Sequence, residues 1–243
     1  MNRLDAKSPD AKSVDAKTDA KTDAKILASL LALLLVMAGM IFAAAGTLQY
    51  WQAWLFLLVY AGASLLGTID LMRRDRALLR RRMKGGPFAE KEPIQRLIMS
   101  IVSVAFIGLL LVPALDHRFG WSRMPSLAAI GGDLLVVLGY AGILRVFREN
   151  SFSAATVEVV PDQTVISTGP YAIVRHPMYA AATVLMAGIP IALGSWWGLA
   201  VLAAIVPVLI WRLVHEERVL AEQLPGYRYY LSRVRWRLVP KIW

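Results

Sequence analysis

Two clusters of chemically capable side chains flank one pair of apolar segments. Residues 169–179 read GPYAIVRHPMY and place an arginine, a histidine and two tyrosines immediately before an apolar segment. Residues 215–218 read HEER and follow the next apolar segment, which returns along the first. The two open ends of a helical hairpin lie at the same membrane face. We therefore expect cations, rings and carboxylates to line one ligand site there.

The triplet Arg175-His176-Pro177 has the residue types of an anion receptor. Proline is favoured in the first turn of a helix, so Pro177 should open a helix with His176 at its N-terminus. Free backbone N–H groups there favour an anion, and Arg175 adds a planar fork suited to a carboxylate. Alternatively, Arg175 and His176 are ordinary cationic flanks of a membrane span, and Tyr171 and Tyr179 are ordinary interfacial aromatics. The density of rings and cations favours the ligand site.

Glu216 and Glu217 are unusual residues for the cytosolic end of a membrane span. A carboxylate there gains nothing from the helix dipole and is repelled by anionic lipid. Ionisable groups at such depths are generally functional and need a partner. A metal site at His215 and Glu216 is disfavoured, because the chain has three histidines and no ligand repeat. The partner is a ligand amine or ribose hydroxyl, or a cation of the chain: Arg175, Arg212 or Arg218.

The composition indicates an integral membrane protein. Of 243 residues, 57% are apolar and 18% are charged, and the mean hydropathy is +0.52. Several windows reach the roughly 20 apolar residues that a helical span needs. The net charge of +10 could indicate nucleic acid, but the basic residues lie between apolar segments, as the positive-inside rule expects. The lack of cysteine excludes disulfides and thiolate chemistry, and the lack of glycine-rich nucleotide motifs and of Gly-x-Ser-x-Gly disfavours nucleotide folds and serine hydrolases.

The elements expected to position the site form an all-α bundle of about five to six transmembrane segments. The last two are a tight helical hairpin turned at Gly194-Ser195, and residues 216–243 suit an interfacial helix interrupted at Pro225-Gly226. A basic loop at 73–96 and a polar loop at 150–170 place the site and both termini in the cytoplasm. The apolar segments cover about 26–48, 53–69, 94–115, 127–144, 178–193 and 196–214.

Residues 1–25 repeat an Asp-Ala-Lys unit with nearly balanced charge. Almost no large apolar side chain is present to support a core, so we expect a disordered tail. A signal peptide is the alternative interpretation. The apolar run after Lys25 is long enough to span a membrane and lacks a clear cleavage site, which favours a helix.

The pattern Gly-Pro-Tyr-x-x-x-Arg-His-Pro-x-Tyr, an apolar hairpin and then Glu-Glu resembles the isoprenylcysteine carboxyl methyltransferase family. The wider superfamily includes phospholipid methyltransferases and bacterial methanethiol methyltransferases. The resemblance is specific over about residues 163–235 and only topological before them. It implies a membrane methyltransferase that uses S-adenosylmethionine, with transmembrane helices at 26–146 and the cofactor-binding core at 147–243.

The resemblance also implies site residues. Glu217 matches a cofactor-binding acid, and the substrate-binding arginine of the prenylcysteine enzymes corresponds here to Leu213, next to Arg212. This departure argues against a prenylcysteine carboxylate as the acceptor. In the tail, Gly226 and Tyr229 fit a Gly-x-x-Tyr pattern of the family. The expected cofactor-binding residues are Gln163, Thr164, Val165, Ile166, Tyr171, His176, Pro177, Met178, Tyr179, Glu216 and Glu217.

Methyl transfer to a ready nucleophile depends mainly on alignment, which can supply up to roughly 7–11 kcal/mol of a barrier. Arg175 and Arg212 are therefore expected to serve catalysis as orienting groups rather than as strong bases. The acceptor is a prenylated cysteine carboxylate, a phospholipid amine or a small thiol, with membrane lipids as partners and no metal or nucleic acid. The alternative is a catalytically silent membrane protein that binds lipid or a partner through its basic loop.

Overall fold

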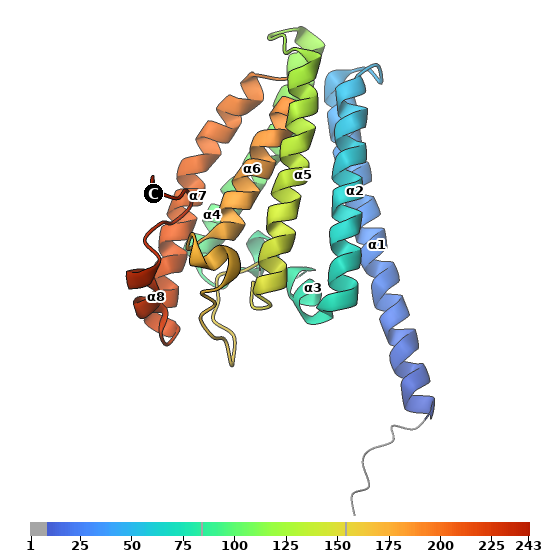
Figure 1. Ribbon diagram of the computed structural model, residues 1–243. Helices are drawn as coiled ribbons and strands as arrows, with labels where there is room; N and C mark the ends of the chain where they lie inside the picture. The colour runs from blue at the N-terminus through green and yellow to red at the C-terminus, as the bar shows by residue number, and fades with distance from the viewer. Residues whose placement is uncertain (1–8, 84, 154) are drawn as a thin grey trace, which may run out of the picture.

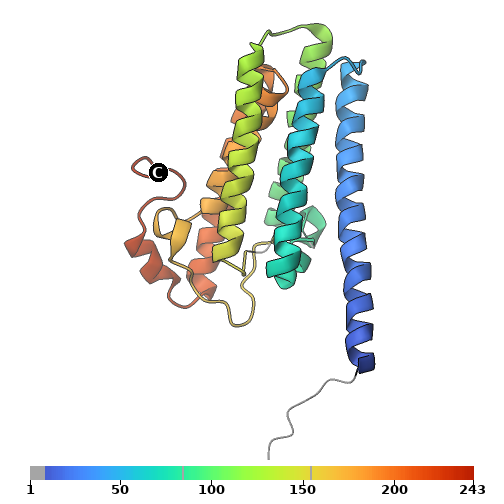
Figure 2. The ribbon, with the colours of Figure 1, turned by 45° about the vertical axis from the view of Figure 1, so that its right-hand side comes forward.

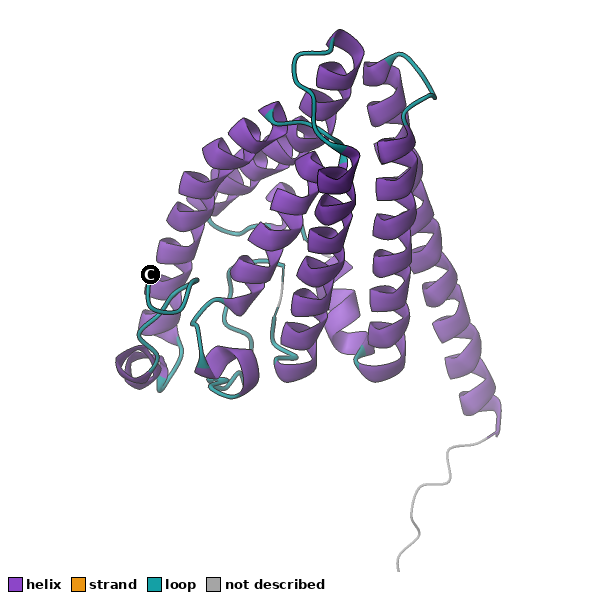
Figure 3. Ribbon diagram, turned by 45° about the horizontal axis from the view of Figure 1, so that its top comes forward, coloured by secondary structure: helices purple, strands orange, loops and turns teal. Residues whose placement is uncertain are grey.

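The computed structural model describes residues 9–83, 85–153 and 155–243, and every regular element within them is helical. Five of these helices are long and apolar enough to cross a membrane, namely α1, α2, α4, α5 and α7. The predicted all-α membrane architecture is therefore confirmed (Figure 3). The elements are α1 (Pro9–Ala45), α2 (Trp51–Arg74), α3 (Arg76–Met83), η1 (Pro87–Ala89), α4 (Pro93–Phe119), α5 (Ser126–Glu149), η2 (Gly169–Ala172), α6 (Pro177–Ala192), α7 (Trp197–Gln223) and α8 (Tyr227–Arg233).

The fifth apolar segment, α6, is shorter than the others. Its 16 residues span about 24 Å at 1.5 Å per residue, less than the roughly 30 Å of a bilayer core. Pro177 is its first residue, as predicted. The proline ring presets the helical backbone angle where no intrahelical N–H bond is lost.

The last two apolar helices are consecutive, but each packs mainly on another helix. Gly194, at φ +74°, allows the turn between them. Away from this turn, α6 lies along α5, and α7 lies along α4 (Figures 1 and 2). The predicted hairpin is therefore present, and each of its arms also packs on a helix outside it.

Glycine brings α5 and α6 into close contact. A Cβ atom added at Gly139 would lie 2.5 Å from Leu185 Cβ, and one at Gly188 would lie 2.7 Å from the Gly132 carbonyl oxygen. Small residues of this kind allow membrane helices to approach closely. This contact fixes the start of α6, which carries the first chemical cluster, against α5.

A buried carboxylate anchors the opposite end of the bundle. Asp116 of α4 is 1% exposed. It accepts hydrogen bonds from the Ser122 backbone N–H at 2.7 Å and from the hydroxyls of Ser122 and Ser195 at 2.5 Å each. These bonds connect the α4–α5 loop to the turn between α6 and α7.

Both ends of the chain differ from expectation. Residues 9–25 begin α1, where the sequence predicts disorder; alanine and lysine favour helix, and the adjoining apolar segment removes the cost of nucleation. Residues 1–8 lie outside the described residues. The helix predicted at 216–243 is interrupted at Pro225-Gly226 as expected, but its first part belongs to α7, which continues to Gln223. Only the short α8 follows the break, and residues 234–243 return as an irregular segment.

Candidate functional site

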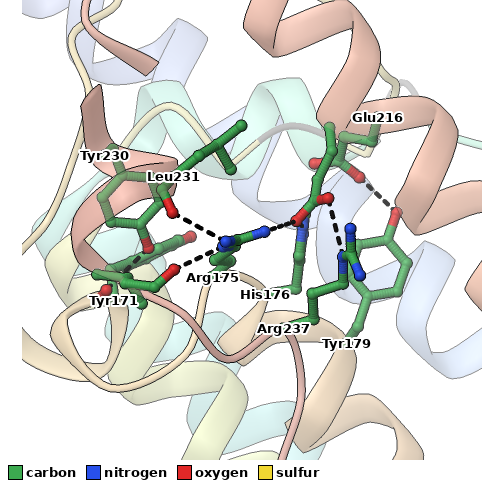
Figure 4. Close-up of polar contacts among 10 residues, drawn as sticks. Tyr171, Arg175, His176, Tyr179, Glu216, Tyr230, Leu231 and Arg237 are labelled. Carbon is green, nitrogen blue, oxygen red and sulfur yellow. Dashed lines mark hydrogen bonds and ion pairs between the residues drawn. The ribbon is translucent and has the colours of Figure 1, made fainter. Parts of the chain in front are cut away.

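The two clusters meet at the lower end of the bundle in Figure 1 (Figure 4). Arg175 and His176 immediately precede α6, and Glu216 and Glu217 lie in α7. The Tyr179 hydroxyl donates to Glu216 Oε2 at 2.5 Å. Nε2 of the His176 ring lies 3.2 Å from Glu217 Oε1. The predicted meeting of the clusters is therefore confirmed.

Glu217 is the centre of a buried ion cluster (Figure 4). The residue is 7% exposed. Besides the contact with His176, its Oε1 accepts from Arg175 Nη1 at 3.2 Å and its Oε2 accepts from Arg237 Nε at 2.9 Å. Both carboxylate oxygens are thus engaged within the protein. Its expected role in cofactor binding stays a prediction.

The C-terminal segment occupies the donors that the sequence assigns to an anion. The guanidinium of Arg175, the backbone N–H of Arg175 and the backbone N–H of His176 all point at residues 231–237. They donate at 2.6–3.0 Å to the carbonyl oxygens of Leu231, Val234, Trp236 and Arg237. Arg175 therefore fastens this segment across the start of α6.

A cavity of about 380 Å³ opens beside the ion cluster. Small-molecule sites commonly have volumes of 300–1,000 Å³. Every predicted site residue lines it except Glu217: Gln163, Thr164, Val165, Ile166, Tyr171, Arg175, His176, Pro177, Met178, Tyr179, Arg212 and Glu216. The two adjacent acids thus have different surroundings. Glu216 faces the cavity, whereas Glu217 contacts Arg175, His176 and Arg237.

Tyr171 is fixed on one side of the cavity. Its hydroxyl accepts from Asn150 Nδ2 at 2.9 Å, and its carbonyl accepts from the Tyr230 hydroxyl at 2.8 Å. Burial raises the pKa of the Tyr171 phenol. The hydroxyl therefore stays protonated at neutral pH and is available for hydrogen bonding.

Arg212 connects the cavity to a buried polar network. Its Nη1 donates to Gln95 Oε1 and its Nη2 to Glu90 Oε1, each at 2.8 Å, and Nη2 also donates to the Ala155 carbonyl at 3.2 Å. The neighbouring Leu213 is fully buried and lies outside the cavity lining. Of the two positions that the resemblance singled out, the arginine is the one at the cavity.

Several site residues were missed from the sequence. Glu90 is 2% exposed and accepts from the Val157 N–H at 3.3 Å, so it holds the loop that covers the cavity. Its signal in the sequence is an acid in a basic loop, in the run Glu90-Lys91-Glu92. Arg82 also lines the cavity, where the sequence predicts only a charge that orients the basic loop or binds anionic lipid headgroups. Among the described residues, no group of three or more His, Asp or Glu side chains could hold a metal ion.

Comparison with known proteins agrees with this geometry. Residues 127–225 match the model of the phospholipid methyltransferase family. No curated protein matches the chain. The matched segment contains α5, α6, α7 and the loop at 150–168, which supply most of the cavity wall. Residues 127–225 therefore form a phospholipid methyltransferase domain of the isoprenylcysteine and phospholipid methyltransferase superfamily.

Proposed function

We propose that the protein transfers a methyl group from S-adenosylmethionine to a lipidic or small acceptor in the cavity beside Glu216. The observation that carries this proposal is that one cavity, walled mostly by the matched methyltransferase segment, gathers every residue that the family resemblance assigns to the cofactor except Glu217. The basic residues of α3 and its flanking loops lie at the same end of the bundle. By the positive-inside rule, they support a cytosolic cavity.

The chemistry of the lining residues fits this cofactor. Glu216 supplies a carboxylate for an ammonium or sulfonium group, and its described interactions include no ion pair. Tyr171 and His176 add polar rings, and Val165 and Ile166 add apolar wall. When bound, S-adenosylmethionine supplies a methyl group activated by its positively charged sulfur.

The residues of the chain would act by binding and orienting. The Glu217 cluster holds Arg175 and His176 in place, and Arg212 fixes α7 against the covering loop. Correct alignment supplies up to roughly 7–11 kcal/mol of a barrier, and exclusion of water strengthens the electrostatic interactions further. We assign no residue the role of a strong general base.

The acceptor class follows from an assay with three substrates. The full chain in lipid nanodiscs is given S-adenosylmethionine labelled in the methyl group, with a prenylated cysteine, phosphatidylethanolamine or a small alkyl thiol. Transfer to one of them, lost in Glu216→Gln and retained in Glu222→Gln, supports the proposal. Glu222 is exposed on the same helix and lies outside the cavity lining. Absence of both transfer and calorimetric cofactor binding would leave a silent lipid-binding protein.

A further inference from the structure

Arg82 reaches the cavity from outside the matched methyltransferase segment. It lies near the end of α3, a short helix that carries three arginines in its last turn. Its guanidinium carbon lies 5.0 Å from the centre of the Phe147 ring, in a cation–π contact with α5. Arg82 thus lines the cavity while its guanidinium also contacts α5.

Arg82 shares the cavity with a second guanidinium. Arg212 faces the same space and is close enough to repel Arg82, while the rings of Tyr171 and Tyr179 also lie within electrostatic range. Burial, which removes water from the charge, lowers the pKa of Arg82. Glu90 pairs with Arg212 at 2.8 Å. An anion bound in the cavity would reduce the repulsion between the two guanidinium groups.

The cavity also extends into the membrane-spanning part of the bundle. From Pro177 to Met186, both in its wall, α6 rises about 13 Å at 1.5 Å per residue. That rise approaches half of the roughly 30 Å thickness of a bilayer core. Four helices supply apolar side chains to the wall: Met99, Val102, Ile143, Ala182, Met186 and Leu209.

We propose that Arg82 is a specificity-determining residue that binds the anionic group of the methyl acceptor, while the apolar wall receives the acceptor's chain. This inference rests on the proposed methyltransferase function. The residues assigned to the cofactor lie on the loop at 163–166, in η2, at the start of α6 and near the end of α7. Arg82, Met99 and Val102 instead come from α3 and α4, which precede the matched segment. The anionic group is a carboxylate or a phosphate.

Direct binding separates this inference from the enzymatic proposal. The full chain in nanodiscs is titrated calorimetrically with dodecyl phosphate, laurate and dodecanol, and separately with S-adenosylmethionine. Tighter binding of one anion identifies its group, and dodecanol measures the contribution of the chain. We expect Arg82→Gln to weaken the preferred anion about 10- to 100-fold, the range of one hydrogen bond between charged groups. Dodecanol and cofactor affinities should not change.

Two variants guard against a purely structural effect. Arg82→Lys keeps the charge and should recover part of the anion affinity, although it loses the planar fork. Arg80→Gln removes a neighbouring exposed arginine outside the cavity lining and should leave all affinities unchanged. Equal loss of anion and dodecanol binding, unchanged anion binding, or a weakened cofactor affinity in Arg82→Gln would each overturn the assignment. Failure of the wild type to bind S-adenosylmethionine would instead refute the proposed function.

Discussion

Replacing Glu217 by glutamine should loosen the C-terminal segment as well as the site. The change keeps the size of the side chain and removes its charge, while Arg175, His176 and Arg237 remain around it. Glutamine offers one acceptor oxygen where the carboxylate has two. The variant therefore leaves a buried cation without its counter-ion.

The expected cost follows from the burial of each partner. The side chains of Glu217 and Arg175 are 9% and 13% exposed, so their pair resembles a buried salt bridge. Breaking such a pair costs about 3–5 kcal/mol. Arg237 is 33% exposed, and solvent reduces its share. We therefore expect the lower end, about 3 kcal/mol, which would lower Tm by about 6–12 °C in a chain of this size.

Thermal unfolding and limited proteolysis measure this effect together. Tm is recorded for the wild type, Glu217→Gln and Glu222→Gln in the same nanodiscs. Trypsin cleaves after arginine, so release of residues 234–243 should expose Arg235 and Arg237 to early cleavage only in Glu217→Gln. A Tm within 1 °C or so of the wild type, with the segment equally resistant to trypsin, would refute the role of Glu217 as the central clamp.

Three further changes test other parts of the structure. Glu216→Gln should weaken calorimetric binding of S-adenosylmethionine about tenfold or more, because the cavity loses a carboxylate that can bind a cation; unchanged affinity would contradict this role. Gly139→Ala should lower stability by about 1–3 kcal/mol in denaturant titrations, because its methyl group would overlap Leu185. Gly131→Ala, where nothing lies within 4 Å, is its control, and equal stability of the two would count against close α5–α6 packing. Asp116→Asn should lower Tm through the loss of about 1–3 kcal/mol of buried hydrogen bonding, and an unchanged Tm would show that the anchor at that end is dispensable.

The broad arrangement could be predicted because it follows from hydropathy and from proline. Long apolar runs require membrane helices, and Pro177 marks the start of α6. The meeting of the two clusters then follows from one antiparallel pair of segments. The pairing of these two segments is the only contact between distant residues that this prediction requires.

The division of labour within the site could not be predicted in the same way. Neighbouring residues on a helix point about 100° apart, and the sequence does not say that Glu216 faces the cavity while Glu217 does not. The same holds for Arg212 and Leu213. The carbonyl partners of the Arg175 side chain are Leu231 and Val234, and backbone carbonyl groups are the same in every residue, so the sequence does not reveal them. Arg82 belongs to a run of three arginines. Because all three carry the same charge, the sequence does not show which of them reaches the cavity.

The central claim is that the cavity beside Glu216 binds S-adenosylmethionine. Ultraviolet cross-linking of the labelled cofactor to the full chain, followed by mass spectrometry of its peptides, tests it most directly. The account predicts label on peptides containing residues 163–179 and 212–227, removed by excess unlabelled cofactor and reduced in Glu216→Gln. Competable label confined to the opposite end of the bundle, around Asp116, or no competable label at all would contradict it.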